Sequence, residues 1–295
     1  MSDVAELDLS EFAEEIGAEG PITIAGLATR GGPVDGVRPV MAPGGIVSFT
    51  PDEMTVRCGA GTPMIELDEA LAAHGQTVAI PPSGTVGGAL AVGRSGLRRL
   101  GHGPVRDALL QARYVSAAGE VVKAGGPTVK NVSGFDLCRL LVGSYGTLGF
   151  IGEVILRTRP VAAFEQWFVS DADPDRLLRD LYRPTSILWD GEQSWVLLEG
   201  HRVDVAAQAE ENGLVAGDPP IDIPSGGRWS MKPSELTTVA GPGRFVAEVG
   251  VGVVHHEHPA PARAVDPAVV ELHRRIKARF DPTGRLNPGV DVLAL

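Results

Sequence analysis

Residues 143–154 read GSYGTLGFIGEV, and this stretch decides the fold class. Gly143, Gly146 and Gly149 recur at intervals of three, which leaves room for a flat ring, and the apolar run after them is typical of a strand. Ser144 and Thr147, between the glycines, carry hydroxyl groups that can donate to phosphate oxygens. A short helix over residues 137–142 is predicted just upstream, after a turn at residues 133–134.

A second glycine-rich stretch, AGLATRGG at residues 25–32, directly follows the predicted strand Ile22–Ala25. Successive backbone N–H groups in a tight turn can hold a pyrophosphate. The stretch is not a G-x-G-x-x-G pattern and no convincing helix follows it, so a Rossmann dinucleotide fold is excluded. The Walker pattern of P-loop proteins is also absent from the chain.

The third stretch, PPSGTVGGALAVGRSGLRRLGHGPVRDALL at residues 81–110, is the longest. We interpret it as a loop whose amides and hydroxyls make a second approach to a dinucleotide, since loops of this length without a task are uncommon. Its arginines suit phosphate oxygens, although some of them are expected to be solvated or paired with residues such as Asp107. They are Arg94, Arg98, Arg99 and Arg106.

Composition limits the class of protein. The chain is 43% hydrophobic, which is enough to form a core. Its length of 295 residues is more than one compact domain usually holds. The net charge of −11 argues against a nucleic-acid partner. No secretory signal and no apolar run of about 18 residues are visible. We therefore expect a cytoplasmic protein whose two cysteines, Cys58 and Cys138, are free and buried.

Secondary structure changes character along the chain. Short strands are predicted before residue 160, at Ile22–Ala25, Ile46–Thr50, 54–58, 113–116, 121–123 and 151–158. A helix is predicted with Thr62 as N-cap and Pro63 at its first position. After Pro160 strand-like runs alternate with short amphipathic segments, which indicates a second α+β domain. A last helix is predicted over residues 266–280, with an apolar face formed by Val269, Leu272, Ile276 and Phe280.

Together the three glycine-rich stretches resemble the FAD-binding domain of the FAD-linked oxidase superfamily, which has the vanillyl-alcohol-oxidase or PCMH-type fold. GSYGTLGFIGEV looks like the G-S-x-G-T-L-G-x-I motif of that family, and PPSGTVGGALA and GLATRGG look like its two earlier loops. VKNVSGFDLCRLLVGS, GRWSMKPSEL and HRRIKARFDPTGRLNPG are similar to one branch, the smaller FAD-binding subunit (E subunit) of bacterial glycolate oxidase. The resemblance is clear over residues 21–160 and weaker beyond.

The resemblance implies an α+β protein in three parts. Residues 1–160 would form a PCMH-type FAD-binding domain of two subdomains, and residues 161–265 a smaller α+β cap domain. Residues 266–295 would form a helix and tail that pack back on the FAD-binding domain, with residues 287–289 returning to it.

It also implies non-covalent FAD, because no histidine or cysteine occupies the first loop. The residues implied to bind FAD come from all three stretches. They are Ala28, Thr29, Arg30, Gly31, Gly32, Pro82, Ser83, Gly84, Thr85, Gly87, Gly88, Gly134, Gly143, Ser144, Gly146, Thr147, Gly149 and Ile151. The first loop and residues 82–88 would hold the pyrophosphate, and Gly134 with residues 143–149 would lie near the flavin.

Two departures from the family pattern stand out. The elements before the first loop are compressed into about twenty residues, and the H-x-G-D-G-N-x-H motif of the catalytic relatives is missing. Residues 255–258, HHEH, come nearest to a metal-binding pattern. Neighbouring residues of a strand point to opposite faces, so only His256 and His258 could converge. We therefore predict a solvated strand end there and no metal site, and we assign no catalytic residue.

The predicted function is an FAD-dependent oxidoreductase subunit, an accessory or electron-relay part of a glycolate or D-lactate oxidase or dehydrogenase. Its partners by resemblance are a larger FAD-containing catalytic subunit and an iron–sulfur subunit, with attachment to the inner membrane only through them. One alternative is a stand-alone 2-hydroxy acid dehydrogenase, in which the short cap with Arg228 and Lys232 would supply the carboxylate clamp and the catalytic base. Others are a scaffold that has lost FAD and, less supported, a UDP-N-acetylmuramate dehydrogenase.

Overall fold

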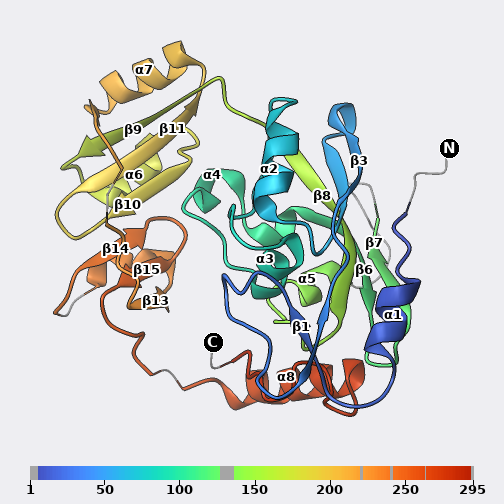
Figure 1. The fold of residues 1–295 in the computed structure, drawn as a ribbon. Coiled ribbons are helices and arrows are strands. Elements are labelled where there is room, and N and C mark those ends of the chain that lie inside the picture. The colour runs from blue at the N-terminus through green and yellow to red at the C-terminus, as the bar shows by residue number, and fades with distance from the viewer. Residues whose placement is uncertain (1–5, 127–135, 220–221, 240–241, 263, 294–295) are drawn as a thin grey trace. The chain divides into compact units, whose positions relative to one another are not determined.

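Strand β8 (Phe150–Pro160) is the central strand of the sheet that carries the candidate site. In the computed structural model, which describes residues 6–126, 136–219, 222–239, 242–262 and 264–293, it directly continues the stretch GSYGTLG (Figure 1). The strand order in this sheet is β3 (Ile46–Thr50), β4 (Thr55–Gly59), β8, β6 (Leu109–Val115) and β7 (Val121–Gly125). A further strand, β5 (Gln76–Val78), pairs antiparallel with the far end of β8.

Two compact units divide the chain. The first unit consists of residues 1–95, 104–161 and 265–295, and the second consists of residues 96–103 and 162–264. The first unit is therefore built from three separate segments of the sequence, and the second unit takes in a short segment from the middle of the third glycine-rich stretch.

Helices cover one face of the β8 sheet in the first unit, and their apolar side chains form its main core with Val56, Val154 and Leu156 of the sheet. The helices that contribute to this core are α2 (Met64–Ala72), α3 (Val86–Val92) and α5 (Leu137–Leu141). The one-turn helices η1 (Pro51–Glu53) and η2 (Val105–Asp107) lie in connections. The core thus fixes both the start of β8 and the start of α3, which border the site.

A small parallel sheet of β1 (Ile22–Ala25) and β2 (Arg38–Met41) supports the glycine-rich loop at residues 25–32. We call this loop the first loop, because it comes first along the chain, and the loop at residues 81–88 the second loop. The sheet shares a core cluster with helix α1 (Ser10–Ile16), and Leu286 of the C-terminal tail is part of the same cluster. Leu286 also pairs with Ile22 in a parallel bridge. The tail therefore packs on the first unit after helix α8 (Pro267–Phe280).

The second unit is built on one mixed-length antiparallel sheet. Its strand order is β12 (Val215–Ala216), β9 (Phe164–Ser170), β11 (Ser194–Gly200), β10 (Ser186–Trp189), β14 (Phe245–Glu248), β15 (Val253–His256) and β13 (Gly227–Ser230). Helices α6 (Pro174–Asp180) and α7 (Arg202–Glu211) pack on its core, and α4 (Arg99–His102) and η3 (Pro233–Thr238) complete the unit. Both units mix helices with antiparallel sheets, so the α+β class is confirmed.

Three predicted helical features differ from the structure. Helix α2 begins at Met64 with Pro63 as its N-cap, because the Thr62 hydroxyl donates to the Gly59 carbonyl instead. Residues 81–110, expected to form one loop, contain the helices α3 and α4. None of the α8 residues, all of which are described, is buried, so its predicted apolar face is largely solvent-exposed. Val269 is 40% exposed and Leu272 is 53% exposed.

Both cysteines are free and buried, as predicted. Burial raises the pKa of the Cys58 thiol to about 12 and that of the Cys138 thiol to about 11. Such thiols carry almost no thiolate at neutral pH, so they act as small apolar side chains of the first core. Within the described residues, no helix combines the length and the apolar character needed to cross a lipid bilayer.

Candidate cofactor site

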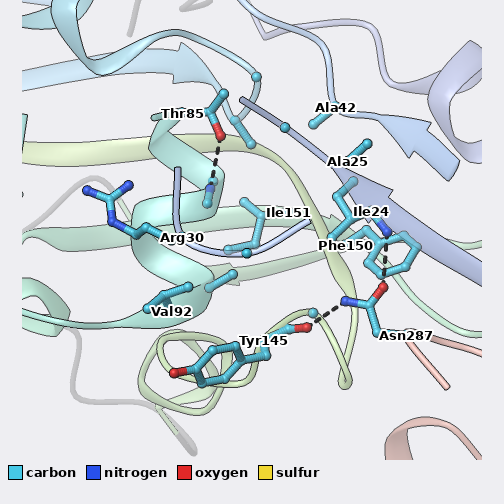
Figure 2. A pocket seen from close by; sticks show the side chains of 18 of the residues that line it. Ile24, Ala25, Arg30, Ala42, Thr85, Val92, Tyr145, Phe150, Ile151 and Asn287 are labelled. Atoms are coloured by element: carbon cyan, nitrogen blue, oxygen red, sulfur yellow. Dashed lines mark hydrogen bonds between the residues drawn. The ribbon is translucent and has the colours of Figure 1, made fainter. Parts of the chain in front are cut away.

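A cleft in the first unit brings together segments that are far apart in the sequence (Figure 2). Its walls come from β1 and the first glycine-rich loop, from the start of α3, from the turn before β8, and from the C-terminal tail. The lining residues are Ile24, Ala25, Gly26, Leu27, Ala28, Thr29, Arg30, Gly31, Gly32, Ala42, Ala60, Gly61, Thr85, Gly87, Gly88, Ala91, Val92, Ser144, Tyr145, Gly146, Gly149, Phe150, Ile151 and Asn287.

Arg30 supplies positive charge on the cleft wall. Its guanidinium donates to the carbonyls of Pro81 and Ser83 and, over 2.9 Å, to the Ser83 hydroxyl. Burial lowers the pKa of Arg30 from its ordinary value, but a guanidinium remains a cation in proteins. One side chain thus ties the first loop to the second and leaves a cation beside the cleft, where phosphate oxygens would be stabilised.

Thr85 caps α3 at the edge of the cleft. Its hydroxyl oxygen accepts from the Gly88 amide over 3.1 Å, and the Gly87 amide donates to the Ala60 carbonyl over 2.7 Å. The amides of Gly87 and Gly88, which belong to the stretch expected to approach a pyrophosphate, are therefore bonded within the protein. Gly87 is required for another reason: a Cβ atom there would lie 2.9 Å from the Ala60 Cβ atom, so the floor of the cleft depends on close backbone packing.

The first loop is more open. A Cβ atom on Gly32 would have no heavy atom within 4 Å, and Gly31 and Gly32 both line the cleft. Residues 26–29 next to them are exposed. This backbone therefore faces free space, and a long anionic group can approach it closely.

The loop before β8 presents its backbone to the cleft, and its hydroxyls point elsewhere. The Ser144 hydroxyl donates to the Leu141 carbonyl over 2.8 Å, and the Thr147 hydroxyl donates to the Ser144 carbonyl over 2.7 Å. Both side chains are buried. Both protons therefore stabilise the turn itself in this structure, and donation by these hydroxyls to phosphate or flavin oxygens stays a prediction.

Asn287 joins the tail to both walls of the cleft. Its Oδ1 atom accepts from the Thr23 hydroxyl over 2.8 Å and from the Ile24 amide over 3.0 Å, and its Nδ2 atom donates to the Tyr145 carbonyl over 2.6 Å (Figure 2). These bonds connect β1, the loop before β8 and the tail. The pattern N-P-G near the end of the sequence was the only signal for this residue.

Two charged residues fix the tail in place. Arg285 is 4% exposed and donates to the carbonyls of Ile16, Gly17, Glu19, Gly20 and Ala117. Lys277 of α8 donates to the Thr147 carbonyl over 2.8 Å and to Asp281 over 2.6 Å. The position of Asn287 in the cleft thus depends on this anchoring.

Asp281 is ionised by its surroundings. Burial acts to raise its pKa, but the Lys277 ammonium and the amides of Leu286 and Arg285 together hold the pKa below its ordinary value. The side chain has no solvent exposure, and it pairs with Lys277. The charge on Asp281 therefore organises the turn that leads into the tail.

The cleft includes most of the residues predicted to bind FAD. Those that line it are Ala28, Thr29, Arg30, Gly31, Gly32, Thr85, Gly87, Gly88, Ser144, Gly146, Gly149 and Ile151. Pro82, Ser83, Gly84, Gly143 and Thr147 do not line it. Gly134 lies outside the described residues. Ile24, Ala42, Ala60, Ala91, Val92 and Phe150 line it and carry no polar signal that a sequence pattern could have revealed.

The four arginines of the glycine-rich stretch at residues 81–110 lie elsewhere. Arg98 pairs with Glu165 over 2.7 Å and with Glu199, both in the second unit. Arg106 lies 3.9 Å from Asp107, as the sequence suggested. None of the four lines the cleft. The local positive charge expected beside a diphosphate comes from Arg30 instead.

The histidines at residues 255–258 do not converge on one point. His255 Nε2 lies 2.9 Å from Glu248 Oε1, whereas the His256 ring stacks on Trp229 with centroids 4.1 Å apart. The His256 and His258 rings are 5.4 Å apart. Burial and then His258 lower the pKa of His256. Among the residues that the structure describes, no three potential ligands are placed to hold a metal ion.

The cleft fits FAD in its chemistry. The exposed backbone of the first loop and the Arg30 cation suit a diphosphate, and the apolar side chains of Ile24, Val92, Phe150 and Ile151 suit a flat ring. A family model described as "FAD binding domain" matches residues 19–125, which include the first two loops. A second one, described as "FAD linked oxidases, C-terminal domain", matches residues 235–290.

Two relatives and one solved structure extend these matches. The chain is 28% identical to the glycolate oxidase subunit GlcE of Escherichia coli (strain K12), over 97% of each chain. It is 40% identical to a D-lactate dehydrogenase of Archaeoglobus fulgidus, but over 37% of this chain and 25% of that relative. The fold resembles that of an alkyldihydroxyacetonephosphate synthase, with a TM-score of 0.64 over 95% of this chain and 73% of that one, at 16% identity.

The likeness at 16% identity concerns the fold alone, and it confirms the PCMH-type architecture. The family matches identify the cofactor as FAD and the type of chemistry as oxidation and reduction. The chain belongs to the FAD-linked oxidase family and is an FAD-dependent oxidoreductase.

Proposed function

We propose that this protein is the FAD-binding accessory subunit of a complex that oxidises a 2-hydroxy acid such as glycolate or D-lactate. One contrast carries the proposal. The match to a glycolate oxidase subunit extends over 97% of the chain, whereas the match to a D-lactate dehydrogenase covers 37% of the chain and 25% of that enzyme. A chain that resembles a subunit along its length, but an enzyme only in part, is expected to work beside another subunit.

The residues of the cleft support the cofactor's role. The first loop with Arg30 would hold the diphosphate, and Ile24, Val92, Phe150 and Ile151 would exclude water around a ring. No histidine or cysteine is among the described residues that line the cleft, which supports non-covalent binding. When bound, FAD supplies an acceptor for electrons that it can pass on.

Partners follow from the word subunit in the name of the full-length relative. By family resemblance they are a larger FAD-containing subunit, which would oxidise the substrate, and an iron–sulfur subunit, which would take the electrons. Any attachment to the inner membrane would then come through these partners. The test is co-purification of the tagged chain, with iron and flavin measured per complex and the membrane fraction assayed separately.

One observation favours a second candidate, a stand-alone dehydrogenase. His255 is held by Glu248, which is 2% exposed, and a buried carboxylate that orients an imidazole is an arrangement found in general bases. Arg228 faces His255 in the register of β13 and β15. In this candidate His255 would accept the substrate proton and Arg228 would bind the carboxylate. Lys232, the other half of the expected clamp, pairs with Glu235 on the surface.

The visible absorption spectrum of the protein purified from cells tests the main proposal first. We expect the two bands of oxidised flavin and release of FAD on denaturation. No bleaching by glycolate or D-lactate is expected from the isolated chain, and bleaching is expected once the partner subunits are added. Bleaching of the isolated chain that is lost in His255→Gln would establish the second candidate instead. A colourless protein that takes up no FAD would contradict both.

A further inference from the structure

The cleft gathers residues in an unfavourable backbone conformation. Among the described residues, five that are not glycine have a positive φ angle: Ala28, Met54, Tyr145, Arg183 and Asn287. Three of them, Ala28, Tyr145 and Asn287, line the cleft. A positive φ is a marked outlier for a bulky residue such as Tyr145, and such strain concentrates at functional sites.

Tyr145 is held in this conformation from both sides. Its amide donates to the Ala91 carbonyl over 2.9 Å, and its carbonyl accepts from Asn287 Nδ2 over 2.6 Å. Asn287 is itself fixed by Thr23 and Ile24. With both its amide and its carbonyl bonded, the backbone of Tyr145 is held in this conformation (Figure 2).

The backbone alone does not require a tyrosine here. The neighbours Gly143 and Gly146 also have positive φ angles, of 82° and 70°, and glycine adopts them without strain. A third glycine at position 145 would serve the turn better than a tyrosine does. The strain therefore indicates that the tyrosine side chain at position 145 has a function of its own.

The position of the ring suggests the task. Two aromatic residues are among the described residues that line the cleft, Tyr145 and Phe150, and Phe150 is only 1% exposed. The Tyr145 side chain is half-buried, and its hydroxyl has no hydrogen-bond partner among the described residues. An aromatic ring at the wall of a dinucleotide cleft can pack on a flat heterocycle, and FAD contains two, the isoalloxazine and the adenine.

We infer that Tyr145 is an aromatic contact of the cofactor, and that its phenol ring packs on a ring system of FAD at a cost in backbone strain. The inference rests on FAD binding by this cleft and goes beyond it by naming the residue that fixes the ring. It also implies that the tyrosine lowers the stability of the apoprotein while it raises the affinity for the cofactor.

The test measures cofactor affinity and apoprotein stability, and it requires no turnover. The full chain is freed of flavin, and dissociation constants for FAD and FMN are measured by titration alongside the thermal midpoint of the apoprotein. Tyr145→Gly should weaken FAD binding about tenfold, since a ring contact of about 1.4 kcal/mol corresponds to that factor. Its apoprotein should unfold at a higher temperature than the wild type, because glycine adopts the positive φ angle without strain. Tyr145→Phe, which keeps the ring, should stay within about threefold.

The matched control is Met54→Gly. Met54 has a φ angle of 52°, the same as Tyr145, but it is 42% exposed and does not line the cleft. The substitution should relieve strain and leave the affinity for FAD unchanged. If Tyr145→Gly does not fold, Tyr145→Asn replaces it, because asparagine tolerates a positive φ and carries no ring.

FMN, which has no adenine, distinguishes the two rings. Equal weakening of FAD and FMN would place the contact on the isoalloxazine, and weakening of FAD alone would place it on the adenine; both support the inference. Unchanged affinity of Tyr145→Gly for both would overturn it, with FAD binding by the wild type still intact. A wild type that binds no FAD would instead contradict the proposed function.

Discussion

The two units differ in what their arginines bind. In the first unit, two arginines hold backbone: Arg30 donates to carbonyls of the second loop, and Arg285 donates to five carbonyls around α1. The first unit also contains pairs of charged side chains, such as Arg57 with Glu153 and Lys277 with Asp281. In the second unit, several arginines and histidines pair with carboxylates. Glu199 pairs with Arg98 and His102, and Glu248 pairs with His255.

We relate this difference to two tasks, cofactor binding by the first unit and recognition by the second. The D-lactate dehydrogenase match covers about a third of the chain, and the match to the FAD binding domain lies almost wholly in the first unit. Backbone held in a fixed path can serve any protein that binds the same cofactor. Pairs of side chains on a sheet can be exchanged one by one, so we expect the second unit to determine what the complex recognises.

Arg285→Met should give the largest effect, because it leaves five carbonyls without their donor. We expect a loss of about 3–5 kcal/mol in the free energy of unfolding of the first unit, and loss of FAD binding with it. Urea unfolding followed by circular dichroism measures the first effect. Arg285→Lys is the control for charge. If lysine fully restored the free energy of unfolding, the planar guanidinium group with its several N–H donors would have no role.

Asp281→Asn should give a smaller effect that depends on pH. The folded pKa of Asp281 lies below its unfolded value, so its charge stabilises the fold above about pH 4 and this contribution is lost as the pH falls through the folded pKa. We expect a deficit of about 1–2 kcal/mol at pH 7 that shrinks towards pH 3. Thermal unfolding across this range measures it, and a deficit independent of pH would contradict the assignment.

Glu199→Gln probes the second unit by itself. It removes the charge that Arg98 and His102 share, and because Arg98 is partly exposed we expect a cost of only about 1 kcal/mol. Proteolysis of the second unit should become faster, while the affinity for FAD should stay the same. A change in FAD affinity would show that the units do not divide the work as described.

The smallest effect is expected from thiol reagents. Thiols with pKa values of about 12 and about 11 hold very little thiolate at pH 8, roughly one part in ten thousand for Cys58. Both cysteines belong to the first unit, so their labelling reports on its opening alone. Neither should react without denaturant, and Glu199→Gln should not change this. Rapid labelling of the native protein would contradict the buried positions.

Local patterns predicted the strands best. The predicted strands Ile22–Ala25 and Ile46–Thr50 match β1 and β3 residue for residue, because apolar and β-branched residues dominate them. Strand β2 was missed because RPVM contains a proline, which usually argues against a strand. Helix α3 was missed because two glycines lower its helix propensity, and a bond from Gly87 to the Ala60 carbonyl compensates.

The site was predictable only in part, because its walls come from distant segments. Glycine-rich stretches identified the first loop and the turn before β8, and the resemblance joined them. Asn287 lies 142 residues from Tyr145 in the sequence, and nothing in its local pattern indicates that the two are bonded. The bonds of Ser144 and Thr147 to nearby carbonyls could not be predicted either, since a hydroxyl in a turn can donate to a ligand or to the turn itself.

The bridge between Ile22 and Leu286 has a consequence for how the protein is made. β1 leaves the ribosome early, but its partner in the tail follows only after the whole second unit has been synthesised. Until Asn287 emerges, the cleft lacks the residue that joins its two walls. We therefore expect FAD to be captured only after residue 287 has emerged, and a product cut short before this residue to stay colourless. The order of synthesis would thus delay cofactor binding until both units have been made.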